Sequence, residues 1–400
     1  MTPQDQDIAS RPSKIMTSAF AGMFVFGIVM AVLGAILPAL FEKIGFSEGA
    51  AGNLFLTMNF AMLVATLAFG PMVDRFGFKA LLVISSFLVA AAFLLLTLAP
   101  TYGLVLAAAV VLGFGGGGLN GGTNALTSDI NPGNRGAALN LLGIYFGFGA
   151  LTVPFLIGAL LESLGLLRIL ILATLLSLLP LALFAVFRFP RAKQAQGFPL
   201  RQAAHVVGHP LLWLCGFLLF FESGNEFTAG GWISTYLQKT FHVSPSAAAL
   251  VLAGYWAAIM AGRLASARFA KTLRGERLIL LSAVLALGAA VLLVVSPSGT
   301  LAMAGAVLLG LGFSAIYPTT LSIVGESFSS FTGTAFSVVI AVGLAGGMIS
   351  PWLVGRIAQA SSLRHGLIVP VFSCAMIILL LALITRTLES RREAGLKKQT

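Results

Sequence analysis

Charged residues are scarce in this sequence. Only 9% of its 400 residues are Asp, Glu, Lys or Arg, whereas ordinary soluble domains carry about a quarter. So long a chain with so few charges cannot cover a water-facing surface, which excludes an ordinary soluble protein. Cysteine is scarce too, since Cys215 and Cys374 are isolated within apolar segments. This excludes a disulfide framework and leaves no metal-ligand spacing, so we expect no metal and no cofactor.

Strand-like alternation is also missing, and long apolar runs take its place. Hydrophobic residues make up 58% of the chain, in runs of about twenty, the length that a helix needs to cross a bilayer. The missing alternation excludes an outer-membrane barrel. Helices are expected because lipid offers backbone groups no hydrogen-bond partner. The run from Met16 to Phe41 is too long for a signal-peptide core, so we interpret it as a retained first helix.

The apolar runs predict an all-α membrane protein with twelve transmembrane helices. We place these helices at 16–41, 50–72, 79–99, 102–128, 136–161, 166–188, 210–238, 246–267, 277–297, 299–325, 333–356 and 366–388. The connection 189–209 is the longest and separates two six-helix bundles, 16–188 and 210–388. Residues 1–15 and 389–400 are expected to be tails.

The net charge of +11 does not indicate nucleic acid, because the basic residues form no single patch. They lie in short loops and in the tails. With the N-terminus inside, nineteen of the 24 Lys and Arg residues fall on the inner side. The positive-inside rule therefore predicts cytoplasmic termini and a cytoplasmic connection in an inner or plasma membrane. The expected partners are the lipid bilayer and a small solute, and the expected state is a monomer.

An internal repeat supports two halves. When the sequence is shifted by 197 positions, the fourth span falls on the tenth and the fifth on the eleventh without a gap. Asp129 then meets Glu326, and Pro154 meets Pro351. Parallel repeats of this kind occur in carriers whose substrate site lies between the halves at mid-membrane.

The loop between the second and third spans carries a recognisable pattern. It contains Gly70, Asp74, Arg75, Gly77 and Lys79 at fixed spacing. The aspartate can face the positive dipole end of the third span, and the second glycine permits a tight turn. This loop resembles the signature of the major facilitator superfamily. The resemblance implies the major facilitator fold and solute transport by alternating access.

Further gating residues follow from this resemblance. In the superfamily, acids that end the fourth and tenth spans bridge to basic loop residues when the inner side is closed. Asp129 and Glu326 occupy those positions, although a solvated loop acid is the alternative interpretation. The second half repeats the loop only in part, as Gly262-Arg263 without the acid. The predicted gating set is Gly70, Asp74, Arg75, Gly77, Lys79, Asp129, Arg135, Arg263 and Glu326.

Two acids lie inside the seventh span, where acids are rare and costly. At a helical rise of about 1.5 Å, Glu222 lies ~18 Å beyond Pro210, near the midplane. Glu226 is four residues further and shares its helical face. Two carboxylates so close in a low-dielectric site are not both ionised, which suits a proton carrier. Sodium coordination, sugar binding and a structural hydrogen bond remain alternatives.

Other polar and aromatic side chains at suitable depth complete the predicted site. With the two glutamates, the expected binding residues are Asn120, Asn124, Asn140, Tyr145, Asn225, Trp256 and Tyr317. Interhelical hydrogen bonds and interfacial anchoring are the alternative roles for such residues. Pro38, Pro154, Pro318 and Pro351 are expected to kink or break their spans.

The seventh span resembles the fucose permease and sodium–glucose carrier-like group, on Gly224, Glu226, Gly231-Trp232 and Tyr236. This resemblance implies a sugar or related metabolite, coupled to H+ or Na+. The first span here lacks the acid of the fucose permease type, and the fourth has asparagines instead. The pair in the seventh span is therefore the expected substitute.

Three other functions fit the sequence less well than solute uptake. A proton-coupled drug or metabolite antiporter usually carries Gly-Pro-x-x-Gly-Gly in its fifth span, and the residues around Pro154 do not match. A membrane sensor without transport would need an output domain or a long tail. An enzyme is not expected, because the sequence shows no nucleophile–base pairing, phosphate loop or metal cluster.

We predict that Asp74→Asn slows transport, because it removes the charge on which the inner gate depends. The initial rate of solute uptake into membrane vesicles measures this. An unchanged rate would show that Asp74 has no gating role.

Overall fold

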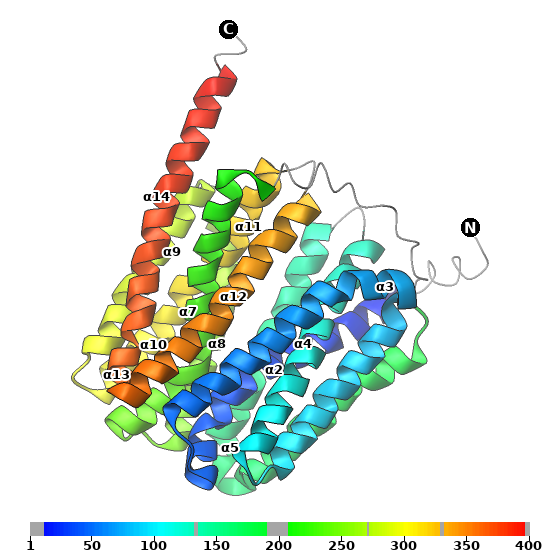
Figure 1. Cartoon of the computed structure of the whole chain (residues 1–400), viewed down its shortest axis with the longest axis vertical. Helices are drawn as coiled ribbons and strands as arrows, with labels where there is room; N and C mark the ends of the chain where they lie inside the picture. Colours follow the sequence, from blue (N-terminus) through cyan, green and yellow to red (C-terminus); the bar gives the residue numbers. More distant parts are fainter. Residues whose placement is uncertain (1–11, 132–134, 190–206, 270–271, 329–331, 397–400) are drawn as a thin grey trace.

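The computed structural model describes residues 12–131, 135–189, 207–269, 272–328 and 332–396. Within these ranges all regular structure is helical, as the sequence predicted. Ten helices of the described residues are long and apolar enough to cross a membrane. Figure 1 shows them as an assembly of tilted helices.

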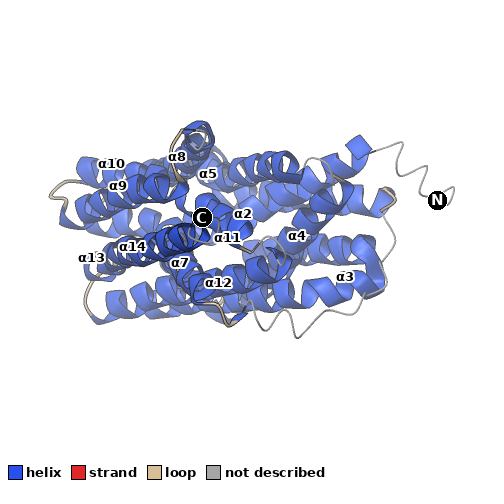
Figure 2. Cartoon of the chain, turned by 90° about the horizontal axis from the view of Figure 1, so that it is seen from above, coloured by secondary structure: helices blue, strands red, loops and turns tan. Residues whose placement is uncertain are grey.

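The helices follow the chain in this order: α2 (Pro12–Ile44), α3 (Glu48–Leu98), α4 (Tyr102–Ile130), α5 (Arg135–Val186), α7 (Pro210–Phe241), α8 (Pro245–Phe269), α9 (Gly275–Val295), α10 (Gly299–Phe313), α11 (Ile316–Ser327), α12 (Thr332–Ala360), α13 (Leu363–Gly366) and α14 (Ile368–Leu396). In Figure 2, α3 and α4 lie at one end of the elongated outline, and α9, α10 and α13 lie at the other.

Glycines interrupt the two longest helices. Gly77 breaks α3 with a φ of 78°, and Gly165 breaks α5 with a φ of 71°. Both values lie in the region that only glycine adopts without strain. The loops expected at 73–78 and 162–165 are thus sharp bends inside continuous helical segments.

The prolines behave differently from one another. The expected span 299–325 is interrupted, since α10 ends at Phe313 and α11 begins at Ile316. Pro318 lies in the first turn of α11, where its missing N–H disturbs no helical hydrogen bond. Pro38, Pro154 and Pro351 lie inside their helices without ending them.

Helix packing divides the described chain into two groups. Helices α2 to α5 pack against one another, and so do helices α7 to α14. The two groups meet mainly along three helix pairs, α2 with α7, α3 with α12, and α5 with α8, and α2 also contacts α8. Figure 1 shows one of these pairs, the blue α3 beside the orange α12.

Close backbone contacts repeat between the two groups. A side chain at Gly113 of α4 would collide with the carbonyl oxygen of Met58 in α3. A side chain at Gly310 of α10 would collide with the carbonyl oxygen of Tyr255 in α8. Adding the repeat distance of 197 positions to Gly113 and Met58 gives Gly310 and Tyr255. The sequence repeat therefore corresponds to equivalent helix packing in space.

The two groups are held together at one end of the molecule. This far end contains the connections 45–47, 99–101, 242–244 and 361–362, opposite the first and last described residues. The ammonium group of Lys239 in α7 lies 2.6 Å from a carboxylate oxygen of Glu48 in α3. The indole nitrogen of Trp352 in α12 donates to Asn53 in α3 at 3.1 Å.

Glycine permits the closest approach between the groups. A side chain at Gly34 of α2 would collide with the carbonyl oxygen of Gly230 in α7. Small residues let helix backbones touch, which supplies van der Waals packing where the bilayer supplies no hydrophobic drive. The far end is therefore closed by direct backbone contact as well as by polar contacts.

We predict that Lys239→Gln separates the two groups at the far end. The pair is partly exposed and contributes at most ~1 kcal/mol, which changes a population ratio roughly fivefold. Spin labels on Glu42→Cys and Ser244→Cys, both exposed and on different groups, should report more long distances. The native cysteines are buried and should stay unlabelled.

The reversed pair is the control. Glu48→Lys combined with Lys239→Glu should restore the short distances. Equal distance distributions in all three proteins would show that this ion pair does not hold the far end closed.

Candidate functional site

Helix α7 carries two carboxylates deep inside the protein. Glu226 is residue seventeen of the 32 in α7, so it lies at the middle of the helix. Glu222 lies one turn earlier, at 0% exposed surface, and Glu226 is 9% exposed. The polar segment 222–226 thus occupies the centre of a helix that packs on α2, α8, α11, α12 and α14.

Glu222 is surrounded by its own helix group. The hydroxyl of Ser223 lies 3.3 Å from one carboxyl oxygen. The other oxygen is buried and has no hydrogen-bond partner among the described residues. A carboxyl group with one hydrogen-bond partner is thus enclosed where an uncompensated charge is costly.

Glu226 has a basic partner. A guanidinium nitrogen of Arg263, from α8, lies 3.7 Å from a carboxyl oxygen of Glu226. The Glu226 side chain is 11% exposed and that of Arg263 is 31% exposed. The Tyr255 hydroxyl donates to the backbone carbonyl of Glu226 at 3.3 Å. An ion pair between α7 and α8 therefore lies inside the second helix group.

Sequence reasoning had placed Arg263 among the gating residues of the inner surface. In the structure its long side chain reaches the glutamate pair. This direction agrees with helix geometry, since side chains tilt toward the N-terminus of their helix, here toward the middle of the molecule. Tyr317 of α11 also lies within electrostatic range of Glu222, Glu226 and Arg263.

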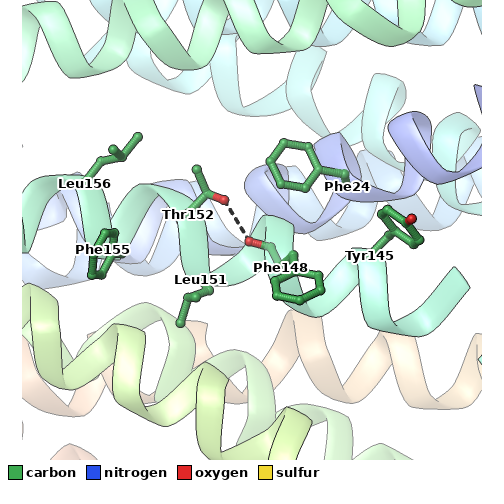
Figure 3. A pocket seen from close by; sticks show the side chains of 7 residues that line it. All are labelled: Phe24, Tyr145, Phe148, Leu151, Thr152, Phe155 and Leu156. Atoms are coloured by element: carbon green, nitrogen blue, oxygen red, sulfur yellow. Dashed lines mark hydrogen bonds between the residues drawn. The ribbon is translucent and has the colours of Figure 1, made fainter. Parts of the chain in front are cut away.

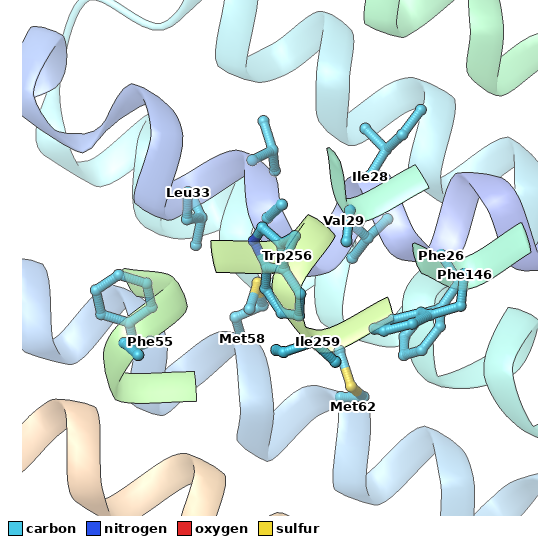
Figure 4. Packing of buried hydrophobic residues seen from close by; sticks show 14 of the residues in the cluster. Phe26, Ile28, Val29, Leu33, Phe55, Met58, Met62, Phe146, Trp256 and Ile259 are labelled. Carbon is cyan, nitrogen blue, oxygen red and sulfur yellow. The ribbon is translucent and has the colours of Figure 1, made fainter. Parts of the chain in front are cut away.

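Aromatic residues of both groups meet beside Arg263. Phe146 of α5 lies edge-on to Trp256 of α8, with centroids 6.1 Å apart. The Arg263 guanidinium carbon lies 6.0 Å from the Phe146 centroid. Figure 4 shows Trp256 and Ile259 of α8 among residues of α2, α3 and α5. Trp256 is 2% exposed, and its indole nitrogen has no partner among the described residues.

The asparagines divide between the two groups. Asn225 is buried, and its amide nitrogen lies 3.4 Å from the sulfur of Cys374 in α14. Asn124 donates to the side-chain oxygen of Asn120 at 2.9 Å, one turn away on α4. Both α4 asparagines are only partly buried. The structure gives them hydrogen bonds within one helix and none to the glutamate pair.

Tyr145 contacts an aromatic residue of α2. It stacks on Phe20 of α2 at a centroid distance of 4.3 Å. Figure 3 shows it at one edge of a groove of about 390 Å³ between α2 and α5. The groove is lined by Phe24, Tyr145, Phe148, Leu151, Thr152, Phe155 and Leu156. The side chain of Asn140 is outside the described residues.

Apart from Arg263, the predicted gating residues lie at the end of the molecule where the described chain begins and ends. Gly77 forms the bend in α3, and Arg75 and Lys79 beside it are exposed. Asp129 is partly buried in the last turn of α4, and Glu326 accepts a hydrogen bond from Ser322 at 3.2 Å. Gly70, Asp74 and Arg135 lie in helices, but their side chains are outside the described residues.

Sequence reasoning missed two sets of residues. Glu48 and Lys239 looked like ordinary charges at helix ends. Phe146 is one of many phenylalanines, and its place between Trp256 and Arg263 depends on how α5 meets α8. A search for opposite charges at equivalent ends of the two halves could have found the first set. Nothing in the sequence distinguished Phe146.

Known transporters have sequences similar to this chain. An uncharacterized MFS-type transporter of Yersinia pestis is 25% identical over 359 residues, covering 89% of this chain and 91% of the relative. The 4-hydroxybenzoate transporter PcaK of Pseudomonas aeruginosa is 30% identical over 185 residues, which covers 45% of this chain and 40% of PcaK.

Solved structures agree in fold. A D-xylose–proton symporter superposes with a TM-score of 0.76 at 16% identity, covering 93% of this chain and 96% of the symporter. The fucose–proton symporter of E. coli superposes with a TM-score of 0.66 at 16% identity, covering 92% and 98%. At such identities the likeness concerns the fold alone.

The family model described as Major Facilitator Superfamily matches residues 19–221 and again residues 212–400. These matches cover nearly the whole chain, once for each helix group. The long apolar helices make it a multi-pass membrane protein. The chain belongs to the Major Facilitator Superfamily.

Proposed function

We propose that this protein is a secondary active transporter that moves a small polar solute by alternating access, coupled to H+ or Na+. The observation that carries the proposal is the Glu226–Arg263 pair at the middle of α7. Ionisable groups at that depth are costly and are kept where a solute or ion pathway needs them. Membership of the superfamily also supports a transport function.

The proposed topology has twelve spans in two bundles, 16–188 and 210–388. Ten apolar helices of the described residues become twelve proposed spans if one long segment is counted as two spans and α7 is added. Gly165 bends the candidate segment Leu141–Val186, which at 46 residues is twice as long as one crossing requires. Helix α7 is 32 residues long and mostly buried, and its polar centre lowers its hydropathy.

We place the protein in the inner membrane. Both termini and the connection 189–209 then lie on the cytoplasmic side. The basis of this orientation is the excess of Lys and Arg at that end. The far end would then face outward, and the closed contacts of Glu48 with Lys239 would describe an inward-facing arrangement. Alternating access requires these contacts to open when the site faces outward.

Glu226 is the proposed coupling residue. It is slightly exposed, it faces Arg263, and its neighbour Glu222 is fully enclosed. A carboxylate that takes up a cation on one side and releases it on the other couples solute movement to the gradient of that cation. Glu222 supports it by holding a second proton-binding group one turn away.

A thermal-shift screen of the purified protein against sugars, nucleosides and organic acids tests the function. A ligand at 100 times its dissociation constant adds about 2.7 kcal/mol of stability. Hits are then tested for accumulation in proteoliposomes under an imposed H+ or Na+ gradient. If no solute is carried under either gradient, the proposed function is wrong.

We predict that Glu226→Gln still exchanges the solute found in that screen but cannot concentrate it. The amide keeps the size of the side chain but cannot bind and release a proton. Counterflow in proteoliposomes should remain, and gradient-driven accumulation should be lost. Glu162→Gln, an exposed glutamate near the far end of α5, is the matched control and should behave like wild type.

Accumulation by the Glu226→Gln protein at the wild-type level would remove Glu226 from the coupling role. Loss of counterflow together with accumulation would instead indicate that the carboxylate is needed for binding the solute.

A further inference from the structure

The guanidinium of Arg263 has unused hydrogen-bonding capacity. Its contact to Glu226 is 3.7 Å long, beyond hydrogen-bond distance. Its Nε is buried and has no partner among the described residues. A guanidinium carries five donors in a fork that fits a carboxylate with two parallel hydrogen bonds. The side chain is 31% exposed, so a solute can reach it.

A second unused donor and an apolar wall lie close by. The buried indole nitrogen of Trp256 also lacks a partner among the described residues. Phe146 contacts both Trp256 and the neighbourhood of Arg263. Met260 lies between them along α8 and touches Gly147 of α5. One charged donor group thus adjoins aromatic and thioether surfaces from both helix groups.

We propose that the transported solute is a small organic acid with one carboxylate and an aromatic or otherwise apolar body. Its carboxylate binds Arg263, and its body packs against Phe146 and Trp256. This inference rests on the proposed transport function and names its substrate class. It departs from the sugar expected from the seventh span, because a sugar has no charge to match Arg263.

The charges at the site favour a monoanion. Arg263 supplies one positive charge, which one carboxylate neutralises. A phosphate ester would bring up to two negative charges and leave one uncompensated inside the membrane, where this is costly. A neutral solute would leave the guanidinium unsatisfied.

The pairing with Glu226 gives this acid a route to proton coupling. A proton that binds the Glu226 carboxylate neutralises it and frees Arg263. The solute carboxylate then takes the place of Glu226 beside the guanidinium. Release of the solute restores the pair and expels the proton. One proton and one carboxylate move together, so the cycle carries no net charge.

Several titratable groups face this pair. Glu222 lies one turn away on α7, and the Tyr255 hydroxyl of α8 donates to the backbone carbonyl of Glu226. Tyr317 comes from α11, and Cys374 of α14 lies 3.4 Å from the amide nitrogen of Asn225. Helices α2, α10, α12 and α13 also pack on α7. Their described charged residues, among them Lys43, Arg356 and Arg364, lie near the helix ends. Glu222 is the one other carboxyl group beside Glu226 among these described residues, so both enter the test.

The test measures binding of benzoate, benzamide and phenyl phosphate to the purified full chain by thermal shift, between pH 5.5 and 7.5. We expect benzoate to raise the melting temperature, and more so at the lower pH. Benzamide, the neutral isostere, and phenyl phosphate should not. Benzoate binding in weakly buffered solution should also draw about one proton per protein from the medium.

Five variants separate the roles of the charges. Arg263→Gln should abolish the benzoate shift, whereas Arg364→Gln, which removes a far-end arginine, should keep it. Glu226→Gln should bind benzoate equally well at both pH values and take up no proton. Glu222→Gln tests whether the proton binds to this second carboxyl group instead. An Arg263→Lys protein that recovers part of the shift excludes a folding defect as the cause.

The proposal is overturned if benzamide or phenyl phosphate stabilises the protein as benzoate does, or if none of the three does. It is also overturned if Arg263→Gln keeps the shift, or if proton uptake persists in Glu226→Gln but not in Glu222→Gln. Transport of a neutral solute with no benzoate binding would reject this substrate class and leave the transport function intact. Absence of any transport would reject both.

Discussion

The high cost of a charge in hydrocarbon is the constraint on which this structure depends. The chain answers it by keeping nearly all its basic residues at helix ends and enclosing the few exceptions between helices. Arg263 is such an exception. It lies beside the acidic Glu226, and each residue offsets part of the charge of the other. Their distance of 3.7 Å leaves the pair weakly satisfied. A weakly satisfied pair can exchange partners, which a tightly bonded one resists.

Close helix packing provides the rigid frame around this pair. Lipid tails are as apolar as leucine, so helices in a bilayer gain little from hydrophobic burial against one another. Glycines let the backbones touch instead, within each group at Gly113 and Gly310 and between the groups at Gly34 and Gly230. The contacts inside each group recur by the repeat. This makes each group a firm body that can tilt as a unit.

The sequence predicted the helical class, the repeat and the two buried glutamates, because each depends on local composition or spacing. It did not predict the place of Arg263. A basic residue after glycine near a helix end fits an inner loop, and only the length and direction of its side chain bring it to Glu226. Tyr145 was expected at the site, and the contact that the structure gives it, the stack on Phe20 beside an apolar groove, did not follow from the sequence. Which side of a helix faces a partner depends on packing across both groups, and a single sequence does not contain that information.

The pair of Glu226 and Arg263 lies within one helix group, and this limits how it can act on the movement of the two groups. Glu226 and Arg263 both belong to the second group, so tilting one group against the other does not by itself separate them. Phe146 belongs to the first group and contacts this region from across the interface. A solute held between Arg263 and Phe146 would therefore connect the two groups, whereas the ion pair alone would not. At the far end the opposite holds, because Glu48 and Lys239 come from different groups and must part when that end opens. Occupancy of the centre and closure of the far end thus act on the same interface, and this is how binding in one place can change access at the other.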